Sequence, residues 1–340
     1  MPRKTRVLFI WNVDSRLRNY LQSQFSQFSN VDLIFPSHPS HEEYMKFAPT
    51  VNIIVGWRPT KDLLQQAKKL QLFIAPGAGV QHLIELFVNV NRFRKVALAN
   101  CHSNSPFVAQ HAVALLLVLA NKVVIHHNWM VAGEWRRGDE SAKSTPLQKR
   151  RIGLLGYGAI NQKVHKLLSG FDVDFSILRR RWKSQQIPLP THAKKYAPED
   201  LHPFLDEVDI LIVAVPLTSR THHLIAKREL ELLGSNGLLV NVARGHIIDE
   251  TALFTALKTK RIAGAAIDTW YDYDPKPDAK GRKYPFSHPF HELPNVVLSP
   301  HRAASPLDDS TRWNEVVENI QRYAQGRKAF LNVVDLTREY

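Results

Sequence analysis

The chain has a single cysteine, Cys101, so it cannot form an internal disulfide bond. This favours a reducing compartment, because stable disulfides belong mainly to oxidising surroundings. Long apolar runs are missing too: the apolar part of the N-terminal segment covers only Val7 to Trp11, too short for a signal peptide. The longest apolar stretch, Val108 to Ile125, is interrupted by polar residues and predicts a buried helix, not a membrane span. We therefore expect a cytoplasmic protein with no membrane partner.

Internal repeats, low-complexity tracts and a Gly-x-Ser-x-Gly nucleophile motif are also absent from the sequence. The adjacent pairs His126–His127 and His222–His223 do not predict a metal site, because neighbouring side chains point in different directions. Positive charge is in excess, with a formal net charge of +14. Such a charge favours anionic partners. However, the basic residues are scattered and no RNA-binding signature accompanies them, so we expect a basic surface and no nucleic-acid partner.

The length of 340 residues and the ordinary composition (44% apolar, 22% charged) suggest about two soluble domains. Short apolar runs alternate with amphipathic segments, which predicts parallel sheets covered by helices. Five such runs lie at 7–11, 31–35, 51–57, 70–76 and 96–100, and six more at 152–155, 173–178, 210–215, 237–242, 262–267 and 296–299. Six is the strand number of the doubly wound dinucleotide fold. Between the two sets, a polar cap at residues 103–106 predicts one long apolar helix ending near Met130.

The stretch from Arg151 to Trp182 predicts a dinucleotide site. A strand-length run ends at Gly156, the turn continues through Gly158, and a segment with helical spacing opens at Ala159 and Ile160. In such a unit the glycines let the backbone approach a pyrophosphate, and free N–H groups at the helix start meet its charge. Two features depart from the pattern. Asn161 replaces the third glycine and should loosen the helix–strand contact, and Arg179, Arg180 and Arg181 stand where an acid would bind an NAD ribose.

Further polar residues follow other predicted strands, where ligands bind in open parallel sheets. These are Arg244, Asp268 and His301. Arginine can hold a carboxylate in a two-pronged contact, and histidine can pass a proton near neutral pH. Hydride transfer to the carbonyl of a 2-oxo acid needs both. The alternative interpretation is a surface arginine, a capping aspartate and a surface histidine.

An ordered set of motifs favours the first interpretation. The motifs are Pro76–Val80, Ser103-Asn104 before Val108–His111, Gly133–Trp135, Val215–Thr218 with Thr221, Asn241–Gly245 with Asp249-Glu250, Gly264–Asp268, and Ser299–His301. In these motifs the chain resembles, over nearly its whole length, the D-isomer-specific 2-hydroxyacid dehydrogenases, in particular NADP-type members that are similar to glyoxylate/hydroxypyruvate reductases.

The resemblance implies a role for each matching residue. Arg244 would bind the substrate carboxylate and polarise the 2-oxo group, and His301 would be the acid in reduction and the base in oxidation. Main-chain N–H groups near Ala78 and Gly79 would also hold the carboxylate. Asp268 would bond to the nicotinamide carboxamide near the Ala243 carbonyl. Asn104 would join the substrate site, and the cofactor site would comprise Gly156, Gly158, Ala159, Ile160, Arg179, Arg180, Val215, Pro216, Thr221, Ala243 and Asp268.

The third catalytic position departs from the family. The family usually has a glutamate that pairs with the histidine and raises its pKa. Counting forward from Arg244 reaches Tyr273, whereas counting back from Pro275 reaches Asp274. Without a carboxylate the pKa of His301 should be lower, which would shift the pH optimum without abolishing the chemistry. Both candidates stay open at this point.

Cofactor preference depends on Arg179, which occupies the place of the family's NAD-selecting acid. An aspartate there accepts hydrogen bonds from both ribose hydroxyls and repels a 2′-phosphate. Arginine cannot accept a hydrogen bond and attracts the phosphate, so the sequence predicts NADP(H) over NAD(H). A solvated basic turn with relaxed selectivity is the alternative.

Together these observations predict an NADPH-preferring reductase of a small 2-oxo acid, giving the D-2-hydroxy acid, without a metal. We expect a Rossmann-type cofactor domain at 103–306 and a smaller flavodoxin-like α/β substrate domain at 1–102 and 307–340, with a C-terminal helix from about Leu307. The active site would lie between them, and the family implies a homodimer built through the cofactor domains. The alternative function is a non-catalytic, dinucleotide-sensing partner protein like the related transcriptional corepressors.

Overall fold

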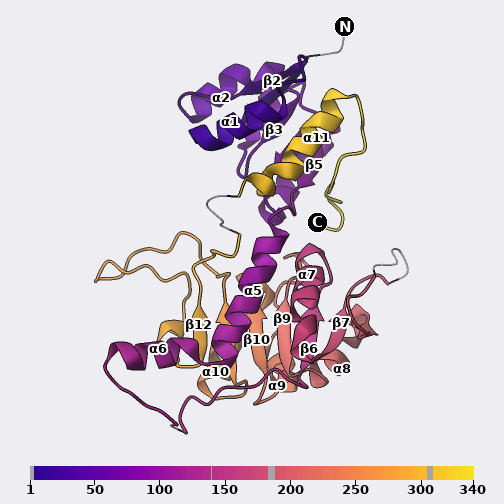
Figure 1. Ribbon diagram of the computed structural model, residues 1–340. Helices are drawn as coiled ribbons and strands as arrows, with labels where there is room; N and C mark the ends of the chain where they lie inside the picture. The colour runs from indigo at the N-terminus through magenta and orange to yellow at the C-terminus, as the bar shows by residue number, and fades with distance from the viewer. Residues whose placement is uncertain (1–3, 139, 183–187, 305–308) are drawn as a thin grey trace. The chain divides into compact units, whose positions relative to one another are not determined.

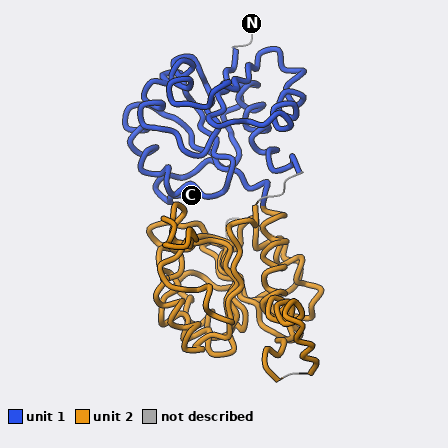
Figure 2. Tube along the Cα trace, turned by 90° about the vertical axis from the view of Figure 1, so that its left-hand side faces the viewer, with its two compact units in different colours: residues 1–104, 306–340 blue, residues 105–305 orange. Residues whose placement is uncertain are grey.

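A computed structural model describes residues 4–138, 140–182, 188–304 and 309–340. The chain forms two compact units, one of residues 1–104 and 306–340 and the other of residues 105–305 (Figure 2). The expected boundary at 306–307 and the expected helix start near Leu307 lie outside the described residues. In the described C-terminal segment, helix α11 spans Asn314–Ala324.

The first unit is built on a five-stranded parallel sheet, of which β2, β3 and β5 are labelled in Figure 1. The strand order is β2-β1-β3-β4-β5. All five apolar runs in this part of the sequence form strands, as predicted. Strands β3 and β4 are buried along their whole length, which is typical of parallel strands whose two faces are both covered. The order is that of the flavodoxin-like doubly wound fold. The strands are β1 (Thr5–Phe9), β2 (Val31–Ile34), β3 (Ile53–Val55), β4 (Leu72–Ala75) and β5 (Ala97–Asn100), and the other helices are α1 (Ser15–Gln24), α2 (His41–Phe47), α3 (Lys61–Gln66) and α4 (Ile84–Asn91).

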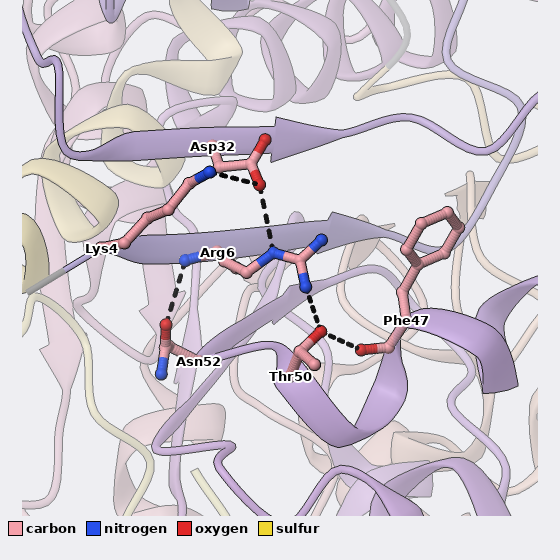
Figure 3. A network of polar contacts seen from close by, with 6 residues as sticks. All are labelled: Lys4, Arg6, Asp32, Phe47, Thr50 and Asn52. Carbon is pink, nitrogen blue, oxygen red and sulfur yellow. Dashed lines mark hydrogen bonds and ion pairs between the residues drawn. The ribbon is translucent and has the colours of Figure 1, made fainter.

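A polar network around Arg6 joins the first strands of this unit (Figure 3). The Arg6 side chain donates from Nε to Asp32 on β2 at 3.1 Å and from Nη1 to the Thr50 hydroxyl. Its main-chain N–H donates to Oδ1 of Asn52 at 3.0 Å. These bonds stabilise β1 against β2 and against the segment before β3.

The second unit contains a seven-stranded parallel sheet in the order β12-β11-β10-β9-β6-β7-β8. The chain runs outward from β6 to β8 and then returns to β9 on the other side of β6, so the switch point lies between β6 and β9, where doubly wound sheets bind ligands. The strands are β6 (Arg151–Leu155), β7 (Asp174–Leu178), β8 (Ala193–Tyr196), β9 (Ile210–Val213), β10 (Leu238–Asn241), β11 (Gly264–Ile267) and β12 (Val296–Leu298).

The prediction of six strands in this part was wrong by one. The additional strand is β8, whose sequence Ala-Lys-Lys-Tyr has two exposed lysines. Among the described strands it pairs with β7 alone, at the sheet edge. Edge strands often carry lysine, which discourages pairing with other chains. Such a strand therefore lacks the apolar run by which the buried strands were found.

The long helix expected to end near Met130 is in fact two helices, α5 (Ser105–Ala120) and α6 (Val123–Val131). Their axes differ by 63°. Lys122 adopts a left-handed backbone conformation with φ of 54°, which ends one helix and redirects the chain. Helix α5 is buried as predicted, whereas α6 has no buried residue. Among the described residues no single helix has the length and apolar character to cross a membrane. Only α5 and α6 taken together reach that length and apolar character, and they are bent by 63°.

Two apolar cores cover the two faces of the larger sheet. Helices α5 and α7 (Ala159–Leu168) pack on one face, and α8 (Leu201–Asp206), α9 (Lys227–Leu233) and α10 (Glu250–Lys258) supply the other core. At the β7–β8 edge, Ile177 and Ala193 belong to the α5/α7 face. Leu178 and Tyr196 belong to the opposite face. This alternation fixes the direction of every side chain on these strands.

Candidate active site

The glycine turn after β6 has the geometry that a dinucleotide requires. Gly156 has φ of +83°, and a Cβ atom there would lie 2.7 Å from Cγ1 of Val215 and 2.9 Å from the Ala214 carbonyl oxygen. Only glycine fits here, where the turn after β6 lies against the residues that follow β9. Gly158 is the N-cap of α7, and a Cβ atom built on it meets nothing within 4 Å. The turn is thus closed on the sheet side and open at the helix N-terminus, which can meet a pyrophosphate.

Asn161 has a structural role that the sequence did not predict. The side chain is fully buried, and its Nδ2 donates to the carbonyls of Gly156 at 2.7 Å, Leu155 at 3.3 Å and Ile212 at 3.4 Å. The amide ties α7 to β6 and β9, which is the opposite of the loosened contact expected for this position.

Arg179 follows β7 and lies beside the aromatic ring of Trp182. Its main-chain N–H donates to the Tyr196 carbonyl at 3.1 Å, and its Cζ lies 5.3 Å from the Trp182 ring centroid. In the described part of the chain, its Nη1 is buried and has no hydrogen-bond partner. A buried guanidinium N–H without a partner suits an anionic ligand atom. Arg180, the next residue, is exposed.

The loop after β9 carries three of the predicted cofactor residues, Val215, Pro216 and Thr221. The Thr221 hydroxyl donates to the Pro216 carbonyl at 2.6 Å and accepts from the Thr218 N–H at 2.8 Å. Thr221 therefore closes this loop, because its hydroxyl group already donates and accepts a hydrogen bond within it.

Arg244 stands at the end of β10 in a turn organised by Asn241. The Asn241 side chain accepts from the Ala243 N–H at 3.0 Å and donates to the Arg244 carbonyl at 3.1 Å. Arg244 Nη1 donates to the Ala243 carbonyl at 2.6 Å, so this carbonyl already has one partner. The next residue is Gly245, and a Cβ atom there would lie 2.4 Å from the Trp270 carbonyl oxygen. Glycine is needed here because two backbones meet without room for a methyl group.

Asp268, at the end of β11, is 1% exposed and binds the loop that follows β12. Its carboxylate accepts from the Ser299 hydroxyl at 2.5 Å, from the Arg302 N–H at 2.8 Å and from the Ala303 N–H at 3.2 Å. On the other side of Ser299, Nε2 of His111 on α5 lies 2.9 Å from the same hydroxyl oxygen. Asp268 was expected to meet the nicotinamide, and its three bonds also give it a positioning role.

His301 lies between the residues that Asp268 binds. Its φ is 56°, a left-handed conformation that few residues other than glycine adopt. The bonds from Asp268 to both sides of the loop stabilise this conformation. Burial lowers the pKa of His301, the Arg244 charge lowers it further, and Asp268 acts in the opposite direction.

The structure brings Tyr273, and not Asp274, to His301. The two rings meet edge to face with centroids 5.2 Å apart. The Tyr273 hydroxyl accepts from the Trp270 N–H at 3.4 Å. Asp274 is exposed, and its N–H donates to the Asp272 carboxylate. This contact favours Tyr273 over Asp274 as the partner of His301, and the role of Tyr273 stays a prediction.

Arg244, Asp268, Tyr273 and His301 influence one another electrostatically. Burial lowers the pKa of Arg244, opposed by Tyr273 and Asp268. Burial also raises the pKa of Tyr273, opposed by the Trp270 hydrogen bond and by Arg244. The site therefore holds a fixed cation, a neutral phenol and an imidazole that prefers the neutral form. This combination can bind an anion and exchange a proton.

The residues predicted to hold the substrate from the first unit lie in its own loops. Ala78 and Gly79 follow β4, and Nδ2 of Asn100 donates to the Ala78 carbonyl at 2.7 Å. The Gly77 carbonyl accepts from the Cys101 N–H at 3.3 Å. Asn104 is half-buried in the turn just before α5. The ends of β4 and β5 thus fix the backbone around Ala78.

Sequence reasoning did not assign Asn241, Ser299 and His111 to the site. All three occur in the recognised motifs, so the signal was present, but their roles depend on hydrogen bonds to distant parts of the chain. Trp270, whose Nε1 donates to the Ser299 carbonyl at 2.8 Å, had no sequence signal beyond its place after Asp268.

Comparison with known proteins is consistent with this geometry. Residues 113–303 match the model of the D-isomer specific 2-hydroxyacid dehydrogenase, NAD binding domain. Glyoxylate reductase of Aeropyrum pernix is 31% identical over 277 residues, covering 78% of this chain and 77% of that protein. The chloroplastic/mitochondrial formate dehydrogenase of Arabidopsis thaliana is 27% identical over 316 residues, covering 91% and 78%.

The fold is also shared with solved structures. The D-isomer specific 2-hydroxyacid dehydrogenase of Xanthobacter autotrophicus Py2, in complex with NADPH and MES, superposes with a TM-score of 0.78 at 24% identity, covering 99% of this chain and 100% of that one. The match extends over both units of this chain and therefore over both of its parallel sheets. On the sequence match and the strand-end residues, this chain belongs to the D-isomer specific 2-hydroxyacid dehydrogenase family and is an NAD(P)-dependent oxidoreductase.

Proposed function

We propose that this enzyme reduces a small 2-oxo acid to the D-2-hydroxy acid and prefers NADPH to NADH. The observation that supports it most is the placement of His301 beside Arg244 and Tyr273, on a loop held by Asp268. Arg244 supplies the fixed positive charge that a substrate carboxylate needs, and the His301 imidazole supplies an exchangeable proton.

In this proposal the bound nicotinamide supplies a hydride to the carbonyl carbon. The guanidinium of Arg244 holds the substrate carboxylate and draws electron density toward the 2-oxo group. His301, protonated on its ring, gives its proton to the carbonyl oxygen as the carbon–hydrogen bond forms, and the neutral imidazole takes that proton back in oxidation.

The cofactor preference is argued from Arg179. Its Nη1 is buried without a hydrogen-bond partner among the described residues, so an anion there would gain a charge-assisted bond and remove an unsatisfied donor. An NAD ribose would instead need an acceptor, which arginine cannot provide. The relative from Xanthobacter autotrophicus was solved with NADPH, which is compatible with the same choice here.

The test compares kcat/KM for NADPH and NADH in the wild type and in Arg179→Asp. We expect NADPH to be preferred at least tenfold by the wild type and the order to reverse in the variant. Equal efficiency in the wild type would refute the preference.

The substrate is tested with a panel of glyoxylate, hydroxypyruvate, pyruvate and bulkier 2-oxo acids, with formate assayed in the oxidative direction. Turnover of at least one 2-oxo acid, lost in Arg244→Gln, is the expected result. Tight cofactor binding without turnover of any panel member would point to the sensor function instead.

We also propose a homodimer through the second unit. Helix α6 has no buried residue although Val123, Val124, Met130 and Val131 lie on it, each at least 44% exposed. An exposed apolar helix of this kind is typical of a subunit contact. Analytical ultracentrifugation should give a dimer, and Val131→Asp should shift it toward the monomer. A wild-type monomer at micromolar concentration would exclude this assembly.

A further inference from the structure

Strand β8, which the sequence did not predict, presents two consecutive lysines to opposite sides of the sheet. Ala193 faces the core of α5 and α7, so Lys195, two residues later, points to the same side. Lys194 points to the other side, where its Nζ bonds to Oε2 of Glu207 at 2.9 Å. The side of Lys195 is also the side of α7, the helix that begins at the glycine turn.

Lys195 and Arg179 both contact the ring of Trp182. The Nζ atom of Lys195 lies 5.1 Å from the ring centroid, and the Cζ atom of Arg179 lies 5.3 Å from it. Nε1 of Trp182 donates to the Tyr196 carbonyl at 2.9 Å, which fixes the indole against β8. One aromatic ring therefore holds two cations by cation–π contacts at the carboxyl ends of β7 and β8.

The positive charge at this ring is not neutralised within the described part of the chain. The ion pairs found on neighbouring elements engage Lys194 and Arg151, not Lys195 or Arg179. Arg179 Nη1 is buried there without a hydrogen-bond partner. Two like charges near one ring repel each other, and a dianion bound between them would relieve that repulsion.

We propose that Lys195, positioned by Trp182, is a second cation for the 2′-phosphate of NADPH, alongside Arg179. The inference rests on the proposed NADPH preference and extends it to a residue and a strand outside the glycine unit. The ligand class is an adenosine 2′-phosphate, because the ring lies at the end of β7, where the adenosine ribose of a dinucleotide lies in this fold. A phosphate dianion can accept from the guanidinium and the ammonium together.

The chain offers a matched control for the experiment. Lys195→Gln and Lys194→Gln remove the same charge from adjacent residues of one strand, but only Lys195 lies beside Trp182. Binding of 2′,5′-ADP and of 5′-AMP to the full-length chain is measured by isothermal titration calorimetry. These probes differ only in the 2′-phosphate, and no turnover is needed.

We expect Lys195→Gln to weaken 2′,5′-ADP about tenfold and 5′-AMP less than twofold, as the loss of one charge-assisted hydrogen bond predicts. Lys194→Gln should change neither affinity by more than twofold. Lys195→Arg, which keeps the charge, should restore most of the 2′,5′-ADP affinity. Retained 5′-AMP binding shows that the variant is folded.

Two results would overturn the inference in distinguishable ways. If the wild type binds both probes equally, the proposed NADPH preference is wrong and Lys195 has no phosphate to bind. If the wild type prefers 2′,5′-ADP but Lys195→Gln keeps that preference, or loses both probes together, the cofactor preference stands and the role of Lys195 is refuted.

Discussion

The rings of Tyr273 and His301 meet edge to face, 5.2 Å between centroids and 63° between planes. We propose that this pair takes the place of the carboxylate–histidine pair usual in the family. Tyr273 cannot supply a negative charge near neutral pH, because burial raises its pKa above the ordinary value of 10. The ring, itself 51% exposed, therefore contacts the imidazole without stabilising its charged form, and burial together with Arg244 lowers the pKa of His301.

The first prediction concerns the pH dependence of reduction. In this direction His301 must be protonated. Because its pKa lies below the ordinary value of 6.5, the imidazole of the free enzyme is already mostly neutral at pH 6.5. We expect kcat/KM for 2-oxo acid reduction to fall as pH rises through that lowered pKa, while kcat/KM for oxidation rises over the same range. A reduction profile that stays flat up to pH 8 would contradict the assignment of His301.

Replacing Tyr273 should move this profile in a charge-dependent way. A carboxylate in Tyr273→Glu favours the imidazolium, so the falling limb should shift to higher pH by about one unit. Tyr273→Phe keeps the ring and adds no charge, so its limb should stay near that of the wild type. An equal shift in both variants would mean that the hydroxyl, and not the missing charge, sets the pKa.

Asp268→Asn should damage the enzyme more than Ser299→Ala. The asparagine amide would turn a donor toward an N–H or hydroxyl donor of the loop that carries His301, at a cost of about 1–3 kcal/mol for each unsatisfied group. Displacement of His301 should lower kcat about 10²-fold. Ser299→Ala removes the two hydrogen bonds of one hydroxyl, to Asp268 and to His111, and leaves the Arg302 and Ala303 bonds in place, so it should cost about 1–2 kcal/mol. Thermal unfolding and kcat are measured together, and equal losses in the two variants would argue against a positioning role for Asp268.

Two glycine-to-alanine variants should separate folding from cofactor binding. In Gly245→Ala the new Cβ would lie 2.4 Å from the Trp270 carbonyl oxygen, so the backbone must shift. We expect the free energy of unfolding to fall by about 1–3 kcal/mol and Arg244, the preceding residue, to be displaced. In Gly158→Ala the new Cβ meets no protein atom within 4 Å, so stability should stay within about 0.5 kcal/mol of the wild type. The methyl group would occupy space needed by the phosphates, and cofactor affinity should fall at least tenfold. Unfolding midpoints and cofactor titrations test this contrast, which fails if Gly158→Ala binds the cofactor normally.

His165 should make stability depend on pH. It is fully buried on α7, with Nδ1 2.8 Å from the Tyr157 hydroxyl and Nε2 2.9 Å from the Thr191 hydroxyl. Burial lowers its pKa to about 4. Between that value and 6.5 the unfolded chain binds a proton that the folded chain does not, so the free energy of unfolding falls as pH falls, by about 3 kcal/mol over the window.

The measurement for His165 is urea unfolding at several pH values between 4 and 7. His165→Gln cannot take up this proton, so the slope of stability against pH should flatten, whatever the absolute stability of the variant. An unchanged slope would place the responsible group elsewhere.

The sequence by itself determined the fold class and most strand ends. Buried parallel strands need continuous apolar runs, and the turn at Gly156 needs glycine for a local, conformational reason, so both can be read from adjacent residues. The arginine at position 179 was equally visible, because its significance depends on a fixed distance from the glycine turn. Two features were not predicted from local sequence patterns. They are β8, an edge strand with exposed lysines, and the break in the long helix at Lys122.

The tertiary structure decided which residues act together. Tyr273 and Asp274 are adjacent in the chain, and only the folded structure shows that the Tyr273 ring contacts His301. The bonds from Asp268 to the His301 loop and the contact of Lys195 with Trp182 join different elements. Such contacts depend on the register and facing of strands far apart in sequence, which no local pattern of residues encodes.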